Sequence, residues 1–389
     1  MIRGILKTGA VALLAGAAFA GAAQAGGFNR GTADTDILFE TGRFVSRNSV
    51  TVVAPSLDID SINGAPSSGY EAKTYMIPSF AAKIGVSDNV SCAATYTTPF
   101  GANSTYAGLT VGGAPVGRDP LSVTGSVSQE FITREFGGTC AVGFNLGRGR
   151  LSILGGVFVE TLDFDQRINS GAFNFHLEDT GYGYRIGAAY EIPEIAFRTQ
   201  LMYRSALTHD ATGNVTLVAN GATLVPNAIG NAPFPQSVEF KVQSGVAPGW
   251  LVYGGVKWTD WSVFESLNYT ATAPSSLNFF WRDGWTINAG VAHSFTEKLA
   301  GTVGVTWDNG TSTGYDLSSL ETWTVSSGIS YKANDAVEIR AGAGYSFISA
   351  GTQNYFDSGV PGESTPLPGA KHQAAGHAVA GSLSMRIKF

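Results

Sequence analysis

Val379-Ala-Gly-Ser-Leu-Ser-Met-Arg-Ile-Lys-Phe389 closes the chain, and its side chains alternate between apolar and polar or small. The apolar positions are Val379, Leu383, Met385, Ile387 and Phe389, with Gly381 among them. The alternate positions are Ala380, Ser382, Ser384, Arg386 and Lys388. Successive side chains of a β-strand point to opposite sides, so this period of two predicts a strand with an apolar medium on one side only.

The same two-faced pattern recurs upstream, for example at 184–192, 299–308, 322–331 and 337–347. Short turn sequences fall near 87–89, 147–149, 193–194, 247–248, 296–297 and 334–335. Longer stretches rich in Gly, Ser, Asn and Pro lie near 61–72, 101–130, 169–181, 220–235, 267–278, 311–319 and 354–372. Six short turns and seven long loops predict fourteen strands, and short turns at one end with long loops at the other are typical of an outer-membrane barrel.

The expected fold class is therefore all-β, a transmembrane antiparallel β-barrel. After residue 25 there is no apolar run of 18 residues, and charged residues make up only 14% of the chain. A soluble β-sandwich or a propeller would also alternate. Aromatic residues near the ends of the apolar faces favour the barrel, where they would form interfacial girdles; they are Trp250, Trp285, Trp307, Trp323, Tyr331 and Phe389.

The N-terminal 25 residues have the layout of a secretory signal peptide, with Arg3 and Lys7, an apolar run and Ala23-Gln-Ala25 before the expected cut. An uncleaved anchor is the alternative. Cleavage leaves 22 basic and 30 acidic residues, a net charge of −8 that does not suggest nucleic-acid binding. We expect residues 26–48 to form a plug, or hatch, inside the barrel of residues 49–389, although a disordered periplasmic tail is the alternative.

Enzyme signatures are not found in the sequence. The five histidines show no metal-ligand spacing, and neither a G-x-S-x-G elbow nor a phosphate-binding glycine loop occurs. We expect no enzyme activity, cofactor or metal, although a barrel lipase with a Ser–His pair from different strands stays open. The strand ending in Phe389 is typical of proteins handed to the barrel assembly machinery, an expected partner together with outer-membrane lipid in a Gram-negative bacterium.

Several short motifs in 180–389 resemble those of the FadL-type long-chain fatty-acid transporters. They are Tyr203-Arg-Ser205 with His209 and Gly213, Ala247–Trp250 running into Trp258–Ser262, Arg282-Asp283, Trp307-Asp308 and the terminal aromatic residue. The resemblance implies a plugged fourteen-strand barrel that passes hydrophobic molecules, most of all long-chain fatty acids, and releases them sideways at a kinked strand. The Asn-Pro-Ala that many members carry in the hatch is missing from 34–43. A diffusion porin and a receptor or adhesin are the other candidates.

Strand parity places a set of cations toward the lumen, where one could pair with a ligand carboxylate; they are Arg198, Arg204, Lys257, Arg282 and Arg340. The alternative is that they pair with inward acids such as Glu160, Glu191 and Glu338. The same parity sends Phe158, Met202, Tyr253 and Trp261 inward. These four could line a hydrophobic path or pack against the plug.

Two further features bear on the wall. Pro99 breaks the ladder of the third strand, and Pro78 lies in the neighbouring strand, which allows a lateral opening there. The alternative is that these prolines lie at loop ends without a role in transport. Cys92 and Cys140 share the apolar face of consecutive strands. A disulfide between them depends on a register that the sequence does not give.

Overall fold

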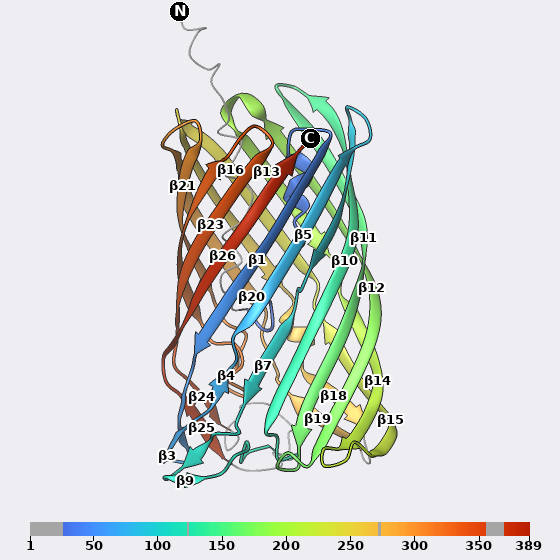
Figure 1. Ribbon diagram of the computed structural model, residues 1–389, viewed down its shortest axis with the longest axis vertical. Coiled ribbons are helices and arrows are strands. Elements are labelled where there is room, and N and C mark those ends of the chain that lie inside the picture. The colour runs from blue at the N-terminus through green and yellow to red at the C-terminus, as the bar shows by residue number, and fades with distance from the viewer. Residues whose placement is uncertain (1–25, 123, 271–273, 355–368) are drawn as a thin grey trace, which may run out of the picture.

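The computed structural model describes residues 26–122, 124–270, 274–354 and 369–389, so the expected signal peptide lies outside the described residues. The described chain forms a closed antiparallel barrel (Figure 1). The barrel has fourteen strands, which confirms the predicted fold class. Its helical elements are short 3-10 turns, and within the described ranges none is long and apolar enough to cross a membrane.

The barrel wall consists of long strands, three of which are interrupted. In chain order the wall contains β1 (Phe44–Ser56), β5 (Tyr75–Gly85), β6 (Val90–Thr97) with β7 (Gly101–Thr105), β10 (Ser128–Leu146), β11 (Gly149–Ile168), β12 (Phe173–Ile192), β13 (Phe197–Arg204) with β14 (Leu207–Leu217), β15 (Thr223–Phe234) with β16 (Ser237–Ala247), β17 (Trp250–Thr259), β20 (Gly284–Ser294), β21 (Leu299–Asp308), β22 (Thr322–Lys332), β23 (Val337–Ile348) and β26 (Gly376–Lys388).

Shorter elements lie mainly at the end of the barrel that carries the long loops. They are β2 (Ile59–Ile62), β3 (Ala65–Ser68), β4 (Glu71–Ala72), β8 (Thr110–Val111), β9 (Ala114–Pro115), β18 (Ser266–Thr270), β19 (Pro274–Asn278), β24 (Gly351–Asn354) and β25 (Ala370–Gln373). The 3-10 turns are η2 (Thr35–Phe39), η3 (Pro193–Ile195) and η4 (Trp261–Val263).

Pairing of the first strand with the last closes the barrel, from Val45 opposite Lys388 to Ser56 opposite His377. Closure gives both strand edges hydrogen-bond partners, as lipid requires. Along β26 the alternation is as predicted, because Leu383 is 56% exposed on the outside and Arg386 is buried inside.

All six predicted short turns connect consecutive strands at one end, the upper end in Figure 1, where the C-terminus also lies. Several predicted loops are wrong in extent: β12 already begins at Phe173, β15 occupies most of 220–235, and β18 and β19 occupy most of 267–278. Their Gly, Asn and Pro residues lie in hairpins at the end of the wall opposite the six short turns. The first strand begins at Phe44, five residues before the expected 49, because the inward Arg47 hides its alternation.

The outer surface carries the expected aromatic residues, including Trp250, Trp285 and Trp323, each more than two-fifths exposed. Cys92 and Cys140 lie directly opposite each other in the β6–β10 ladder and form a disulfide with an S–S distance of 2.07 Å. The disulfide lies on the outer face, since Ala94 and Val142 of the same parity are exposed.

Two breaks interrupt the ladders of the wall. At the first break, the β5–β6 ladder stops at Phe80–Tyr96, and Thr98–Phe100 bend inward before β7 begins. At the second break, the β12–β13 ladder stops at Arg185–Arg204, and β12 is paired again only at Glu178, opposite Thr212 of β14. Cross-strand register puts Thr97, Glu135, Glu160 and Gly181 in one row, which runs from the first break across β10 and β11 to the second.

Candidate functional site

An aromatic cluster fills the lumen near the two breaks. Its centre is Phe28 from the N-terminal segment 26–43, whose ring centroid lies 4.6 Å from that of Trp281 and 4.7 Å from that of Phe131. The cluster consists of Phe28, Phe100, Phe131, Phe234, Trp261, Phe264, Phe279 and Trp281, all 9% exposed or less. Rings at these separations attract one another through dispersion and their quadrupoles, so the cluster is a firm apolar core.

Local backbone geometry positions the rings of the aromatic cluster. The 3-10 turn η4 leaves the end of β17 and carries Trp261 and Phe264 into the lumen. Gly27, at φ +59°, precedes Phe28, and a Cβ there would lie 2.4 Å from Cε2 of Trp261. Glycine is therefore required for the N-terminal segment to bring Phe28 so close to η4.

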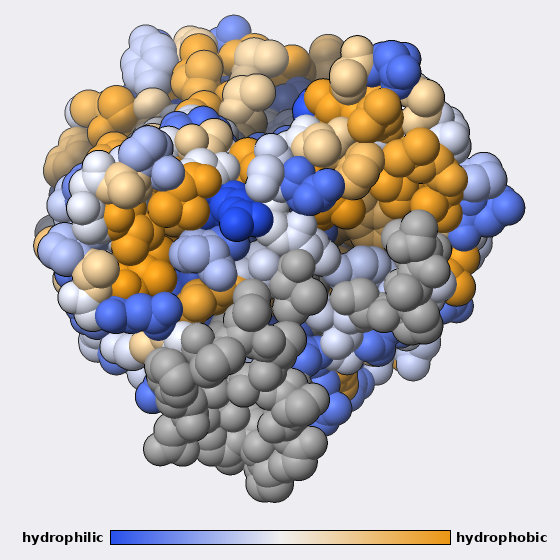
Figure 2. Space-filling view, turned by 90° about the horizontal axis from the view of Figure 1, so that it is seen from below, coloured by the Kyte–Doolittle hydropathy of each residue, from blue (hydrophilic) through white to orange (hydrophobic). Residues whose placement is uncertain are grey.

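An apolar pocket lies between this cluster and the wall of β10, β11, β12, β14 and β15. Its wall side is built from aliphatic and aromatic side chains, among them Leu162, Phe164, Leu177, Ala211 and Ala232. Only about 30 Å³ of it is open, so a larger ligand must displace a ring. A wider cavity of about 340 Å³ opens at the loop end and shares Phe28 and Phe279 with the pocket. Figure 2 shows hydrophobic patches beside hydrophilic residues on this face.

A network of buried charges lies beside the cluster. Arg185 pairs with Glu135, and Arg204 pairs with Glu135 at 3.1 Å and with Glu160 at 2.5 Å. His209, fully buried, contacts Glu160 at 3.4 Å and Asp179 at 2.8 Å. Buried charges need such partners, because an unpaired charge in the interior is very costly.

Some predicted site residues come together at this place. Arg204, Lys257 and Met202 line a second, polar pocket with Pro99 and Phe100 of the first break, and Trp261 belongs to the aromatic cluster. Phe158 lies between two guanidinium groups, with Arg204 Cζ 4.4 Å and Arg185 Cζ 5.0 Å from its ring centroid. It therefore supports the charge network through cation–π contacts and also touches the cluster.

Other predicted residues lie elsewhere. Arg198 lies over the ring of Phe39, 4.9 Å away, so it contacts the N-terminal segment. The hydroxyl of Tyr253 lies 3.1 Å from Oγ1 of Thr302 on the wall. Arg282 does not point into the lumen as parity predicted, because it precedes β20; it is exposed and donates to the carbonyl oxygens of Asn309 and Gly310.

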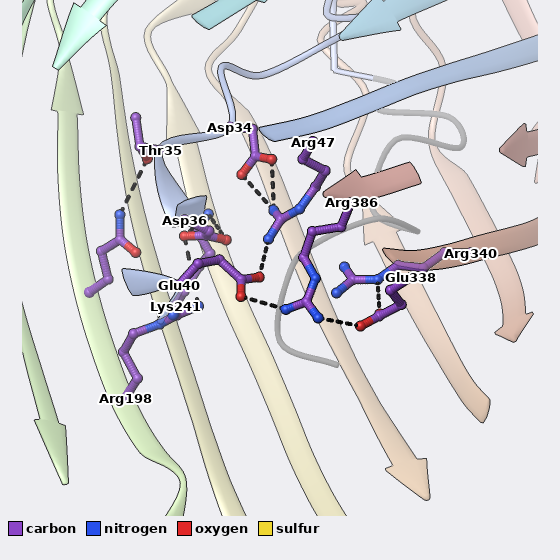
Figure 3. Close-up of polar contacts among 11 residues, drawn as sticks. Asp34, Thr35, Asp36, Glu40, Arg47, Arg198, Lys241, Glu338, Arg340 and Arg386 are labelled. Atoms are coloured by element: carbon purple, nitrogen blue, oxygen red, sulfur yellow. Dashed lines mark hydrogen bonds and ion pairs between the residues drawn. The ribbon is translucent and has the colours of Figure 1, made fainter. Parts of the chain in front are cut away.

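The N-terminal segment is held at the short-turn end by an ionic network, the anchoring network shown in Figure 3. Arg47 binds Asp34 at 2.7 Å and Glu40 at 2.6 Å, and Arg386 bridges Glu40 at 2.8 Å and Glu338 at 2.9 Å. Further contacts join Arg340 to Glu338 and Lys241 and Arg198 to Asp36. The inward acid Glu338 thus pairs with inward cations, which was the alternative left open by the sequence.

Backbone hydrogen bonds tie the same segment to the first break. Arg30 N–H donates to Pro99 O at 2.8 Å, Gly31 N–H to Thr98 O at 2.9 Å, and Gly101 N–H to Phe28 O at 3.0 Å. The inward bend of Thr98–Phe100 is therefore paired with the N-terminal segment in place of β5, so a movement of one requires a movement of the other.

The loop between β21 and β22 covers the cluster from the mouth. Its Ser319 Oγ accepts a hydrogen bond from Gly27 N–H at 2.8 Å, and Asp316 accepts one from Trp281 Nε1 at 3.0 Å. Burial raises the pKa of the Asp316 carboxyl to about 6, although the Trp281 bond acts in the opposite direction.

Sequence reasoning missed Asp34, Asp36 and Glu40, and it missed Glu135 and Arg185. The signal for the first three was available: three acids in seven residues precede strands whose inward positions hold Arg47, Arg340 and Arg386.

One group of possible metal ligands consists of Asp163, Asp165 and His176. These residues come from two strands, so their spacing in the sequence does not reveal the group. It is part exposed on the outer wall, and Arg134 lies 3.7 Å from Asp163.

Comparisons with known proteins agree with this architecture. The long-chain fatty acid transport proteins of Salmonella typhi and Escherichia coli K12 are 24% and 23% identical to the chain over 185 residues, 42% of it. The match spans about two-fifths of those relatives' own length.

Solved structures resemble the whole barrel. A Pseudomonas aeruginosa FadL homologue is 15% identical, with a TM-score of 0.71 over 95% of this chain and 97% of that one. The Pseudomonas putida toluene transporter TodX is 13% identical, with a TM-score of 0.60 over 94% and 95%. A model of outer membrane protein transport proteins (OMPP1/FadL/TodX) matches residues 15–316. With its closed barrel and an N-terminal segment in the lumen, the chain belongs to this outer-membrane family.

Proposed function

We propose that the protein carries hydrophobic molecules across the outer membrane, with long-chain fatty acids as the substrate class. The observation that carries this proposal is the apolar pocket, enclosed in a lumen whose axis is occupied by residues 26–43 and lying beside a break in the wall. A water-filled porin needs no such pocket. An acyl chain gains about 0.8 kcal/mol for each CH₂ that leaves water, so an apolar pocket binds it well.

The polar pocket supports an acid as the substrate. It brings Lys257 and Arg204 beside Phe100, one of the rings of the aromatic cluster. A ligand with its tail among the rings could reach these cations with its carboxylate, and charge-assisted hydrogen bonds of this kind are strong. Toluene would fill the same rings without using the cations.

In this proposal the N-terminal segment is the plug, and the first break is the exit. A ligand that displaces Phe28 also strains the hydrogen bonds from Arg30 and Gly31 to the bend, so binding would loosen the first break. The ligand would then diffuse sideways into the bilayer. Lipase activity gains no support from the relatives, which are described as transport proteins and channels.

The test is uptake of a fluorescent long-chain fatty acid and of labelled toluene into vesicles that contain the purified barrel. Lys257→Met should weaken fatty-acid uptake and leave toluene uptake unchanged. Lys332→Met, at the short-turn end of β22, is the matched control and should change neither. Equal loss of both substrates in Lys257→Met would exclude the head-group role. Large ion conductance with no uptake of either substrate would favour a porin.

A further inference from the structure

We propose that the second break in the wall, between β12 and β13–β14, is a second lateral opening by which a hydrophobic ligand leaves the apolar pocket. The inference rests on the proposed function and adds a route to it. It concerns residues 179–183 of β12 and 206–211, which face them from the neighbouring strand.

The backbone of this stretch is paired on one side only. Residues 179–183 pair with β11, and 207–211 pair with β15, but no register pair joins the two stretches to each other. At the short-turn edge of the break, Ser205 N–H donates to Tyr184 O, and Ser205 Oγ accepts from Tyr184 N–H. In lipid a ladder is normally continuous, because unpaired backbone groups are costly. A gap maintained at this position therefore calls for a role.

Side chains fill the gap. A Cβ at Gly181 would lie 2.8 Å from Cδ1 of Leu207, and a Cβ at Gly183 would lie 2.2 Å from Cζ of Phe158. The two glycines thus leave room into which Leu207 and Phe158 project. Side chains can change rotamer without breaking a ladder, so this closure is easier to open than paired backbone.

The apolar pocket reaches the gap. Leu177 of β12 and Ala211 of β14 both line the pocket, and they flank the loop-side edge of the break from opposite strands. A ligand held against the aromatic cluster therefore lies next to this part of the wall. The same cluster also reaches the first break, because the ring centroid of Phe100 lies 4.9 Å from that of Phe234 in the pocket lining.

A side-chain latch crosses the gap. His209 of β14 is fully buried, and its Nδ1 lies 2.8 Å from Oδ2 of Asp179 on β12. Its Nε2 contacts Glu160, which is also bound by Arg204. Opening requires these polar contacts to separate, and it requires no displacement of the N-terminal segment.

Outside the barrel, the gap meets the membrane surface. Tyr182 projects outward from it and is 74% exposed, and Phe136, two strands away in the same cross-strand row, is 56% exposed. Aromatic side chains of this kind mark the interface between lipid and water. The second opening would therefore deliver ligand to the bilayer near its interface with water.

The experiment locks each break separately in a Cys92→Ser, Cys140→Ser background. Asp179→Cys with His209→Cys seals the second break, and Ser79→Cys with Thr97→Cys seals the first. Ala188→Cys with Leu201→Cys, a directly paired position on the outer face of β12 and β13, is the matched control. Uptake of a fluorescent long-chain fatty acid into vesicles is measured under oxidising and reducing conditions.

We expect the disulfide across the second break to lower uptake, and reductant to restore it. Disulfides across both breaks should abolish uptake, and the control disulfide should not change it. Unchanged uptake with the second break sealed, and complete loss with the first sealed, would overturn the second opening while leaving the proposed function intact. Absence of uptake by the reduced proteins would overturn both. Where a double variant fails to fold, a photoreactive fatty acid is applied to the unmodified protein. Labelling within 206–209, which do not line the apolar pocket, supports the opening, and labelling confined to the pocket and to 97–101 refutes it.

Discussion

The two breaks in the wall lie on one cross-strand row but are closed by different means. At the first, backbone groups of Thr98–Gly101 pair with the N-terminal segment, which is itself fixed by the anchoring network. At the second, a histidine and two carboxylates join the strands, and two glycines make space for apolar side chains. The first closure is therefore coupled to events along the lumen, whereas the second depends on a few local side chains.

This difference predicts that each closure can be weakened without the other. Backbone pairing is cooperative, so its loss frees a whole segment, while a side-chain latch can fail alone. Three changes, taken from the largest expected effect to the smallest, separate the two closures, and a fourth tests the loop that covers the aromatic cluster.

Glu40→Gln should have the largest effect, because it removes the shared partner of Arg47 and Arg386, two buried arginines. Breaking a buried pair typically costs about 3–5 kcal/mol. We expect a lower unfolding temperature on heated gels and rapid proteolysis of 26–43, with exchange at 206–211 unchanged. Glu71→Gln, which breaks an exposed pair with Lys73, is the control. A segment that stays protected in Glu40→Gln would contradict the anchoring role.

Removal of the disulfide comes second. Cys92 and Cys140 join β6 to β10 on the strand that leads into the first break, across 48 residues of chain. A native disulfide commonly contributes about 2–4 kcal/mol. Cys92→Ser with Cys140→Ser should raise amide exchange in β6 and at Thr98–Gly101, and the wild type in reductant should behave alike. Faster exchange in β13–β14 instead would show that the two regions are not independent.

Asp179→Asn tests the second closure alone. It removes the carboxylate that faces His209 Nδ1, and hydrogen bonds to charged groups contribute about 1.5–3 kcal/mol. Amide exchange at 206–211 should accelerate while residues 26–43 keep their resistance to protease. Asp210→Asn, next to the latch but bonded on the surface to Asn231, should have little effect. Similar changes in both variants would argue against a specific latch.

Asp316 gives the smallest and most local effect. Its pKa, normally 3.8, is raised to about 6 by burial, so the packed loop favours the protonated carboxyl. Stability from this group is present below pH 4 and is lost as the pH rises through about 6. Protection factors in 309–321, which are corrected for the intrinsic pH dependence of amide exchange, should therefore be lower at pH 7 than at pH 4.5, and Asp316→Asn should remove the difference. A pH dependence that survives the substitution would assign it to another group.

Much of the fold could be predicted, because lipid imposes a strict period of two that residues such as Leu383 and Arg386 follow. The six short turns follow from the same rule. The start of the first strand was predicted at residue 49, but it lies at Phe44. The polar side chain of Arg47 made this stretch resemble a loop in the sequence. The predicted inward orientation of Arg282 was wrong, because side chains alternate between the two faces only within a strand and Arg282 precedes β20. The two breaks and the aromatic cluster depend on contacts between distant strands, for which Gly181 and Phe28 give no local sign.

The position of β1 has a consequence for the order of assembly. Glu40 finds Arg386 only on β26, and β1 completes the wall by pairing with that same strand. Arg47 of β1 lies close to Asp34 and Glu40 in the sequence, but the second cation that binds Glu40 is supplied only when the final strand joins the barrel. A polypeptide truncated ahead of Arg386 would lack part of the β1–β26 seam and one of the two cations that bind Glu40, so a defect at the C-terminus would also weaken the attachment of the N-terminal segment.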